Sequence, residues 1–298
     1  MTRTAARSRV DRTLSAARLS PVWLVLIGIM SVQFGAAVSK DQFDQIPPVG
    51  MVLLRLMTSS LILLALARPR LGGRTVADWR PVLALGLALG AMNWAFYESF
   101  ARIPLGVAVT IEFIGPLTIA AIGSRRPRDL IWVGLAASGI AIFGLGPTEV
   151  DPLGFGLALL AGACWAIYIL STVATGRRWA GVEGLALSST IATLAIAPFA
   201  VAIAGSDLLE PRLIMLGALV GLLSSTIPYG LEMVALRTLP PRVFGILMSL
   251  EPAAAALVAA VLLHEWLSPL QLVAIACVTA ASVGASRTSS APDAVPDD

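Results

Sequence analysis

The chain has 298 residues, of which 57% are hydrophobic and 13% are charged, and its mean hydropathy is +0.85. Soluble globular domains carry about 25% charged residues, so this composition excludes a soluble protein. The net charge of +3 and the pI near 9.3 do not indicate nucleic-acid binding. The basic residues are dispersed over short segments between apolar stretches, where insertion into a bilayer with anionic headgroups accounts for them.

Ten apolar stretches follow one another along the chain, and each is close to the roughly 20 residues that a helix needs to cross a bilayer. The short gaps leave no room for a soluble domain, and residues 1–18 and 287–298 are expected to be disordered cytoplasmic tails. We therefore predict an all-α integral membrane protein with ten transmembrane helices. They lie near residues 21–38, 48–67, 81–99, 104–123, 130–147, 153–173, 183–204, 213–236, 243–263 and 269–286.

The basic residues are sorted between the two sides of these stretches. The gaps on one side carry only Lys40, Arg102 and Arg212, and Arg55 lies within the second stretch. Short loops rich in Lys and Arg stay in the cytoplasm, so both termini are predicted to be cytoplasmic. The two tails and the remaining gaps carry the other 17 basic residues: Arg3, Arg7, Arg9, Arg12, Arg18, Arg68, Arg70, Arg74, Arg80, Arg125, Arg126, Arg128, Arg177, Arg178, Arg237, Arg242 and Arg287.

The chain also contains an internal repeat. The segment 100–104, followed by Pro116, reappears 136 residues later as the segment 236–240, followed by Pro252. Because each half has five helices, an odd number, the second half would begin on the opposite side of the membrane and have the opposite orientation. Such inverted repeats are typical of secondary transporters that bind substrate near the bilayer midplane. We predict two inverted five-helix repeats, residues 19–147 and 148–286. A chance match of common residues is the alternative.

Four carboxyl groups lie within the predicted spans: Glu98, Glu112, Glu232 and Glu251. A charge near the bilayer centre costs roughly 2.5–3.5 kcal/mol on insertion scales, so such residues indicate a polar cavity or a partner. Glu112 and Glu251 fall near mid-depth and are predicted to face one cavity, although a buried structural hydrogen bond is the alternative. Glu98 and Glu232 are predicted to lie at opposite mouths, although both could instead reach an interface.

Three prolines within spans are predicted to break their helices. Because proline has no N–H, Pro116, Pro228 and Pro252 leave the carbonyls of Glu112, Ser224 and Met248 without helical partners. A free carbonyl beside a carboxyl group makes a polar spot that can bind an ammonium group or a proton. The alternative is a kink that only shapes the packing.

Further polar and aromatic residues occur on the same spans. Arg55, near mid-depth, could hold a substrate carboxylate or pair with a glutamate and fix the helices. The cavity candidates are Gln33, Asn93, Tyr97, Trp165, Tyr168 and Tyr229. No cofactor or metal is predicted, because His264 is the only histidine and Cys164 and Cys277 read as buried apolar residues. An intramembrane enzyme is disfavoured because no metal spacing, phosphate loop or nucleophile–base pair is found.

Several segments carry a resemblance to a known family. They are Leu54-Arg-Leu56, Glu112-Phe-Ile-Gly-Pro-Leu117, Ser124-Arg-Arg-Pro-Arg-Asp129, Gly162-Ala-Cys-Trp-Ala-Ile-Tyr-Ile-Leu-Ser171, Pro228-Tyr-Gly-Leu-Glu-Met233 and Phe244-Gly-Ile-Leu-Met-Ser-Leu-Glu-Pro-Ala253. In these segments the chain resembles the EamA family of the drug/metabolite transporter superfamily, and within it the bacterial inner-membrane exporters of threonine and homoserine. The resemblance implies a multi-pass protein of the bacterial cytoplasmic membrane that exports small amino acids by proton antiport. Export of other metabolites or drugs is the alternative, and the oligomeric state is not predicted.

Overall fold

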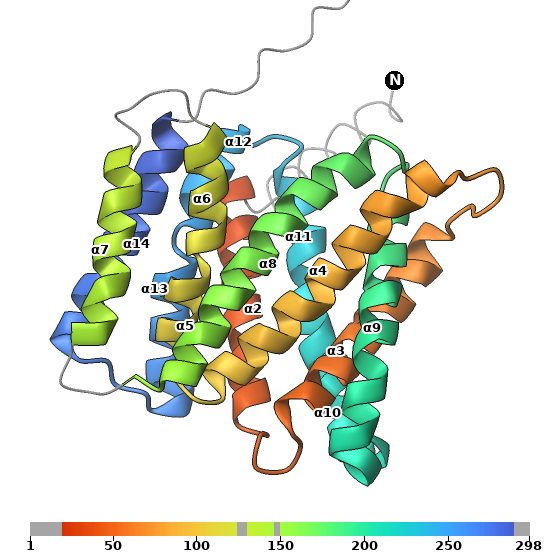
Figure 1. The fold of residues 1–298 in the computed structure, drawn as a ribbon, viewed down its shortest axis with the longest axis horizontal. Coiled ribbons are helices and arrows are strands. Elements are labelled where there is room, and N and C mark those ends of the chain that lie inside the picture. The colour runs from red at the N-terminus through yellow and green to blue at the C-terminus, as the bar shows by residue number, and fades with distance from the viewer. Residues whose placement is uncertain (1–19, 124–129, 146–149, 289–298) are drawn as a thin grey trace, which may run out of the picture.

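The computed structural model describes residues 20–123, 130–145 and 150–288. Within these residues every regular element is helical, and the helices form one antiparallel bundle (Figure 1). The tails and the basic residues Arg3, Arg7, Arg9, Arg12, Arg18, Arg125, Arg126 and Arg128 lie outside the described residues. The expectations for those residues therefore stay predictions.

The helices of the first half are α2 (Pro21–Lys40), α3 (Pro48–Ala67), α4 (Val76–Phe100), α5 (Leu105–Glu112), α6 (Ile114–Gly123) and α7 (Leu130–Leu145). Those of the second half are α8 (Pro152–Gly176), α9 (Glu183–Ala204), the short 3-10 helix η2 (Gly205–Leu209), α10 (Pro211–Gly221), the π-helix η3 (Leu222–Thr226), α11 (Ile227–Ala235), α12 (Pro241–Met248), α13 (Glu251–Val258), the π-helix η4 (Ala259–Leu263) and α14 (Pro269–Thr288). Several begin with proline, whose fixed φ and missing N–H suit the first helical turn.

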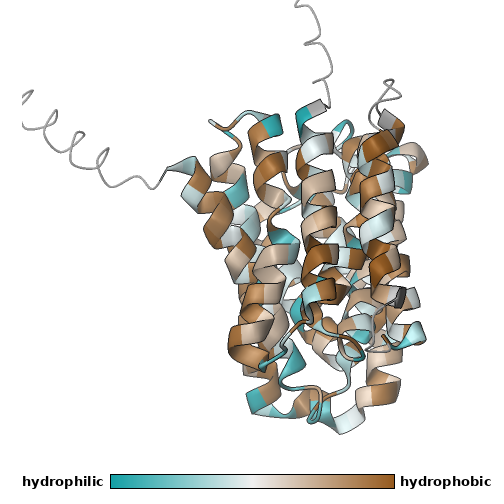
Figure 2. Cartoon of the chain, turned by 90° about the vertical axis from the view of Figure 1, so that its left-hand side faces the viewer, coloured by the Kyte–Doolittle hydropathy of each residue, from teal (hydrophilic) through white to brown (hydrophobic). Residues whose placement is uncertain are grey.

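The described helices are those of a multi-pass membrane protein. By length and composition, 7 of them could cross a bilayer: Pro21–Lys40, Pro48–Ala67, Pro152–Gly176, Glu183–Leu209, Pro211–Ala235, Arg242–Leu262 and Pro269–Arg287. The other predicted spans fall on α4, which carries Asp78, Arg80 and Glu98, and on the shorter apolar helices Leu105–Ala120 and Leu130–Phe143. Apolar residues cover the outward faces of the bundle (Figure 2), among them Leu61, Leu66, Phe199, Ile203 and Met215, each more than 60% exposed.

Three of the predicted spans are not continuous α-helices. The fourth is broken at Phe113 between α5 and α6, the eighth contains the π-helix η3, and the ninth is interrupted between α12 and α13. These three interruptions fall at or next to the residues whose carbonyls a proline leaves without a partner, namely Glu112, Ser224 and Met248. The ninth span also ends in the π-helix η4, which no proline accounts for. The prolines therefore change the backbone itself as well as the direction of the helices.

Neighbouring helices pack unequally at the two ends of the bundle. The extensive pairings join α4 with both α8 and α9, α3 with α9, α7 with α14 and α11 with α2. At the lower end in Figure 1, α5 packs against α13, and all of α5 is buried. A Cβ on Gly106 would lie only 2.9 Å from the Cα of Ala256, so these two helices touch backbone to backbone. At the upper end α6 and α12 do not pack closely against each other.

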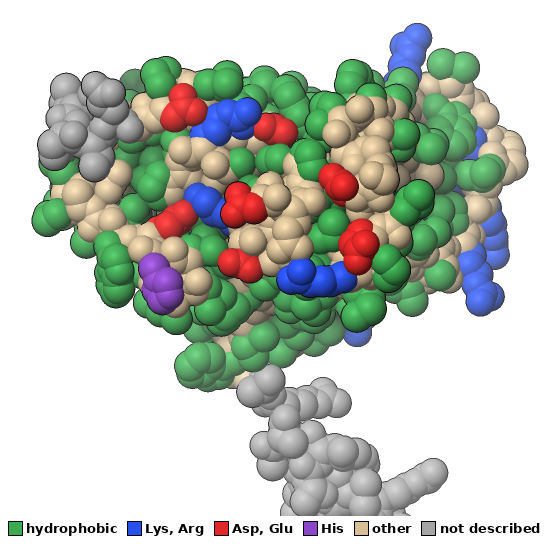
Figure 3. Space-filling view, turned by 90° about the horizontal axis from the view of Figure 1, so that it is seen from below, with side chains coloured by type: hydrophobic (Ala, Val, Ile, Leu, Met, Phe, Trp, Pro, Cys, Tyr) green, Lys and Arg blue, Asp and Glu red, His purple; other side chains and the backbone are tan. Residues whose placement is uncertain are grey.

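Charged residues gather at the two ends of the bundle. The upper end carries basic residues in its loops and in the adjoining helix ends: Arg68, Arg70, Arg74, Arg80, Arg177, Arg178, Arg237 and Arg242. There the N–H of Thr75, then its hydroxyl and Arg178, hold the pKa of Asp78 below its ordinary value. The lower end mixes acidic side chains with a few basic ones (Figure 3). Its residues include Lys40, Asp41, Asp44, Glu98, Arg102, Asp151, Asp207, Glu210, Arg212 and Glu265.

Candidate functional site

A cavity of about 470 Å³ lies between the helices in the upper half of the bundle. Its lining runs from mid-helix positions, such as Glu112 and Ser224, to Phe244 in α12 and Ser286 in the last turns of α14. Toward the lower end it stops at the packed helices α5 and α13. Because α6 and α12 stay apart, the cavity reaches toward the end of the bundle that carries the arginine-rich loops. Its volume falls within the roughly 300–1,000 Å³ typical of small-molecule sites.

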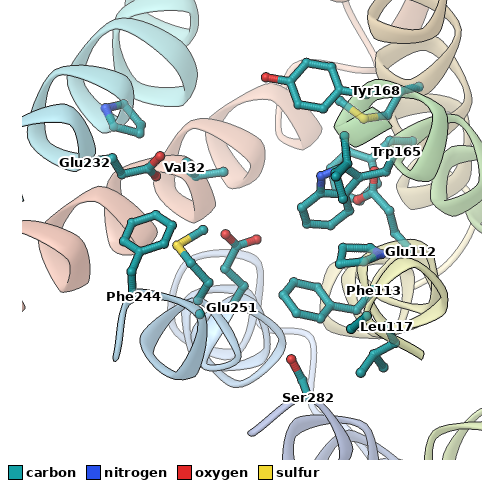
Figure 4. Close-up of a pocket in the computed structure, with 18 of the residues that line it drawn as sticks. Val32, Glu112, Phe113, Leu117, Trp165, Tyr168, Glu232, Phe244, Glu251 and Ser282 are labelled. Carbon is teal, nitrogen blue, oxygen red and sulfur yellow. The ribbon is translucent and has the colours of Figure 1, made fainter. Parts of the chain in front are cut away.

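Three carboxyl groups line this cavity. Glu232 and Glu251 lie on one side, and Glu112 lies beside Trp165 on the other side (Figure 4). Glu112 is 7% exposed and Glu251 9%. Within the described residues, none of the three side chains makes an ion pair or a hydrogen bond to another group of the chain. Carboxyl groups at this depth need a proton or a ligand to offset their desolvation.

Arg55 of α3 also lines the cavity, and the protein holds its guanidinium in place. Nη1 donates to the Tyr97 hydroxyl at 3.3 Å and Nη2 donates to the Ser224 carbonyl at 3.2 Å. The guanidinium carbon lies 5.5 Å from the Tyr97 ring centroid, and Nε has no partner. Arg55 forms no ion pair with a carboxylate of the described chain, so the interpretation of Arg55 as a glutamate partner is not what the structure shows.

The backbone of η3 is satisfied from neighbouring helices. The Ser224 carbonyl, freed by Pro228, accepts from Arg55, and the adjacent Leu223 carbonyl accepts from the Ser31 hydroxyl at 2.6 Å. Irregular backbone at membrane depth is tolerated only where such groups or water replace the missing helical bonds. The sequence predicted that the Ser224 carbonyl would be free, but it did not predict that Arg55 would donate a hydrogen bond to it.

The structure brings most of the predicted site residues together. Besides Arg55, Glu112, Glu232 and Glu251, the cavity wall includes Asn93, Pro116, Trp165, Tyr168, Pro228 and Tyr229. The Asn93 amide donates to the Leu89 carbonyl of its own helix at 2.8 Å. Trp165 packs edge-on against Phe113, with ring centroids 5.2 Å apart. The functional roles of these predicted lining residues stay predictions.

Four predicted residues do not line the cavity. Gln33 is buried between helices and its Oε1 has no partner. Tyr97 is buried behind Arg55 and lies 3.3 Å from the Ser39 hydroxyl. Glu98 forms an ion pair of 2.7 Å with Arg102 near the lower end of α4. Pro252 is buried in the first turn of α13.

Sequence reasoning missed several lining residues: Met92, Phe96, Phe113, Phe244, Ser282 and Ser286. Phe113 directly follows Glu112, and this position in the sequence was an available signal that it lines the cavity. Ser282 and Ser286 are four apart on α14 and share a face, which was an available signal. Within the described residues no three His, Cys, Asp or Glu side chains gather closely enough to share a metal ion.

Known proteins resemble this chain in sequence and in fold. A model of the EamA-like transporter family matches residues 152–287. The threonine/homoserine exporter RhtA of Escherichia coli (strain K12) is 44% identical over 280 residues, which cover 91% of this chain and 94% of that protein. The exporter of the same name from Salmonella typhimurium (strain LT2) is 43% identical over 283 residues, with 91% and 94% covered. In fold, a crystal structure covers 90% of this chain and 98% of its own at a TM-score of 0.55 and 18% identity.

The helices, the polar cavity and these relatives define the class of the protein: a multi-pass membrane transporter and not an enzyme. The chain belongs to the EamA-like transporter family.

Proposed function

We propose that this protein is a secondary active exporter of small amino acids of the threonine and homoserine type, working by alternating access and proton antiport in the bacterial inner membrane. The observation that carries the proposal is the cavity, in which carboxyl groups without partners and one guanidinium face the same space. A zwitterion needs one group of each sign. The relatives named as threonine/homoserine exporters, 44% identical, support this choice of substrate.

A ten-helix architecture of two inverted repeats is part of the proposal, and the helix bounds support it. Adding 136 to the bounds of α5 gives those of α12, Pro241–Met248. The backbone before the two helices is nearly the same, with φ −56° and ψ 139° at Pro104 and φ −57° and ψ 138° at Pro240. The same shift brings α3 and α4 to within a residue of α9 and of α10–α11. The family match, residues 152–287, covers one such unit.

The pairing of helices supports the same symmetry. Exchanging each helix for its counterpart turns the α4–α8 pairing into α11–α2, and the α6–α8 pairing into α13–α2. The pairings α3–α9 and α7–α14 map onto themselves. The two ends differ in that α5 packs on α13 below, whereas α6 and α12 stay apart above. In the proposed cycle this is the inward-open state, and closing the upper end would accompany opening the lower end.

The closed lower end is reinforced by a partly buried ion pair. Lys40 at the end of α2 contacts Glu265 at 2.5 Å and donates to the Ile103 carbonyl at 2.8 Å. Glu265 accepts a hydrogen bond of 2.8 Å from the Leu105 N–H, a donor at the start of α5 that has no partner within its own helix. The pair thus ties α2, α5 and the loop after η4 together where an outward opening would separate them.

Coupling to protons follows from the same acids. A carboxyl group that binds the substrate ammonium must be ionised, and one that carries the driving proton must be neutral. Proton and amino acid therefore exclude each other at a shared glutamate, which is the condition for antiport. Glu251, at the break between α12 and α13, is the first choice for this role, and Glu112 is the second.

A second candidate is the export of larger apolar metabolites or drugs. The observation that favours it is the apolar part of the lining, which includes Met92, Phe96, Phe113, Leu117 and Phe244. Such a wall suits a bulkier side chain than that of threonine.

The experiment that tests the proposal is uptake of radiolabelled threonine into inverted membrane vesicles, which turns export into uptake. The proposal expects accumulation when the vesicle interior is acidic and none after a protonophore. Absence of uptake, together with inhibition by none of the small amino acids, would refute the amino-acid assignment. Competition by apolar compounds would then favour the second candidate.

A further inference from the structure

Arg55 is the only cation among the described residues that line the cavity, and its position is fixed. Its two terminal nitrogens are anchored to Tyr97 and to the Ser224 carbonyl, so the guanidinium cannot swing across the cavity without breaking both hydrogen bonds. Arg55 interacts electrostatically with Glu112, yet the two are beyond ion-pair distance. The positive and negative groups of this site are therefore held apart, and space for a ligand lies between them.

We infer that Arg55 binds the carboxylate of the transported molecule, while a cavity glutamate binds its ammonium group. The inference rests on the proposed function and deepens it, because it makes a carboxylate a required feature of the cargo. A guanidinium presents planar donors that match a carboxylate better than any other side chain does. In a site of low dielectric this interaction discriminates strongly against an uncharged analogue.

The competing explanation is that Arg55 serves only to satisfy the free Ser224 carbonyl. The neighbouring Leu223 carbonyl argues against it, because the neutral hydroxyl of Ser31 satisfies that group at 2.6 Å. A neutral donor therefore suffices for this backbone. A positive charge at this depth, without a carboxylate partner among the residues that the structure describes, is costly and is accounted for by an anion that arrives with the substrate.

The test measures whether the effect of replacing Arg55 on ligand binding depends on the presence of the ligand's carboxylate. Binding to purified protein in lipid nanodiscs is measured by calorimetry for threonine, for threoninol (in which an alcohol replaces the carboxylate) and for 2,3-dihydroxybutanoate (in which the ammonium is absent). The proteins are the wild type, Arg55→Gln, Arg55→Lys and Ser31→Ala. The last removes the neutral donor to η3 and serves as the structural control.

We expect the wild type to bind threonine about 10- to 100-fold more tightly than threoninol, as for hydrogen bonds to a charged group. In Arg55→Gln this ratio should fall close to one, mainly through weaker threonine binding, while threoninol binding stays the same. Arg55→Lys should keep part of the ratio, since it keeps the charge and loses the planar fork. Ser31→Ala should lower the melting temperature and leave the ratio unchanged.

Two outcomes separate this inference from the proposed function. If the wild type binds dihydroxybutanoate but not threonine, and Arg55→Gln abolishes that binding, the amino-acid function is wrong and the role of Arg55 stands. If Arg55→Gln weakens threonine and threoninol equally, Arg55 is structural and the inference is wrong. The inference is also wrong if the wild type binds no carboxylate more tightly than its uncharged analogue.

Discussion

At the scale of single residues, the unpartnered glutamates restrict what the cavity can do. Glu251 begins α13, where the chain resumes its helix after Ser249 and Leu250, and its side chain points into the cavity (Figure 4). Burial and the absence of a protein partner make its charge state depend on what else occupies the cavity. This dependence is what the proposed coupling requires.

Replacing Glu251 by glutamine tests the coupling. A glutamine keeps the size and cannot release a proton, so Glu251→Gln should exchange threonine between equal pools but lose accumulation driven by a pH gradient. The measurement is counterflow and gradient-driven uptake in proteoliposomes. Glu98→Gln, which alters a carboxyl group paired with Arg102 outside the cavity, is the control and should still accumulate threonine. Gradient-driven accumulation by Glu251→Gln would show that another group carries the proton.

At the scale of helices, the breaks in the bundle depend on glycine contacts as well as on proline. The α6 and α8 helices meet at Gly115 and Gly162 beside the break after Glu112. A Cβ on Gly162 would lie 2.7 Å from the Glu112 carbonyl oxygen, and one on Gly115 would clash with the Gly162 carbonyl. The Glu112 carbonyl oxygen therefore packs directly against Gly162, where an added side chain would force the neighbouring backbone to shift.

Gly162→Ala should destabilise the protein by about 1–3 kcal/mol, the usual range for forcing extra atoms into a packed contact. Gly156→Ala is the matched control in the same helix, because nothing lies within 4 Å of its Cβ position. It should be neutral or stabilise by roughly 0.5–1 kcal/mol through helix propensity. The measurement is thermal unfolding of both variants in one detergent. Equal stability of the two would contradict the close approach.

The ion pair at the closed end gives a second prediction at this scale. Lys40→Met leaves Glu265 partly buried without its cation, which should destabilise this end by about 1–3 kcal/mol, between the values for exposed and fully buried pairs. Amide hydrogen exchange in α5 should become faster, because the Leu105 N–H depends on Glu265. Adding Glu265→Gln removes the stranded charge, keeps an acceptor, and should recover part of the protection. Unchanged exchange in both variants would mean that the pair does not hold α5.

At the scale of the whole molecule, the separation of basic and acidic ends predicts the orientation. In a variant with Cys164 and Cys277 replaced by alanine, a cysteine at Ser206 in η2 should react with an impermeant maleimide in intact cells. A cysteine at Gly72, in the basic loop after α3, should react only after permeabilisation. Both sites are exposed. The reverse pattern would overturn the prediction of cytoplasmic termini.

The helices could be predicted from local patterns, and the site only in part. Hydropathy located the apolar helices to within a few residues, and the missing N–H of Pro116, Pro228 and Pro252 located the interruptions. The links between helices were not predictable, because they depend on how distant segments cross. Arg55 meets the carbonyl of Ser224, 169 residues away in sequence. The same crossing places Tyr97 behind Arg55 and outside the cavity, although its polar hydroxyl suggested a lining position.

The matched backbone of α5 and α12 has an energetic consequence. If one helical unit is built twice, each contact that closes one end has a counterpart able to close the other, so the two states are basins of similar depth. The difference in free energy between the two states then depends on the few interactions that have no counterpart in the other repeat. A difference of about 1.4 kcal/mol changes the ratio of the two populations tenfold. In the proposed cycle, a single side chain at one end, such as Lys40, would then be enough to decide which state the empty protein adopts.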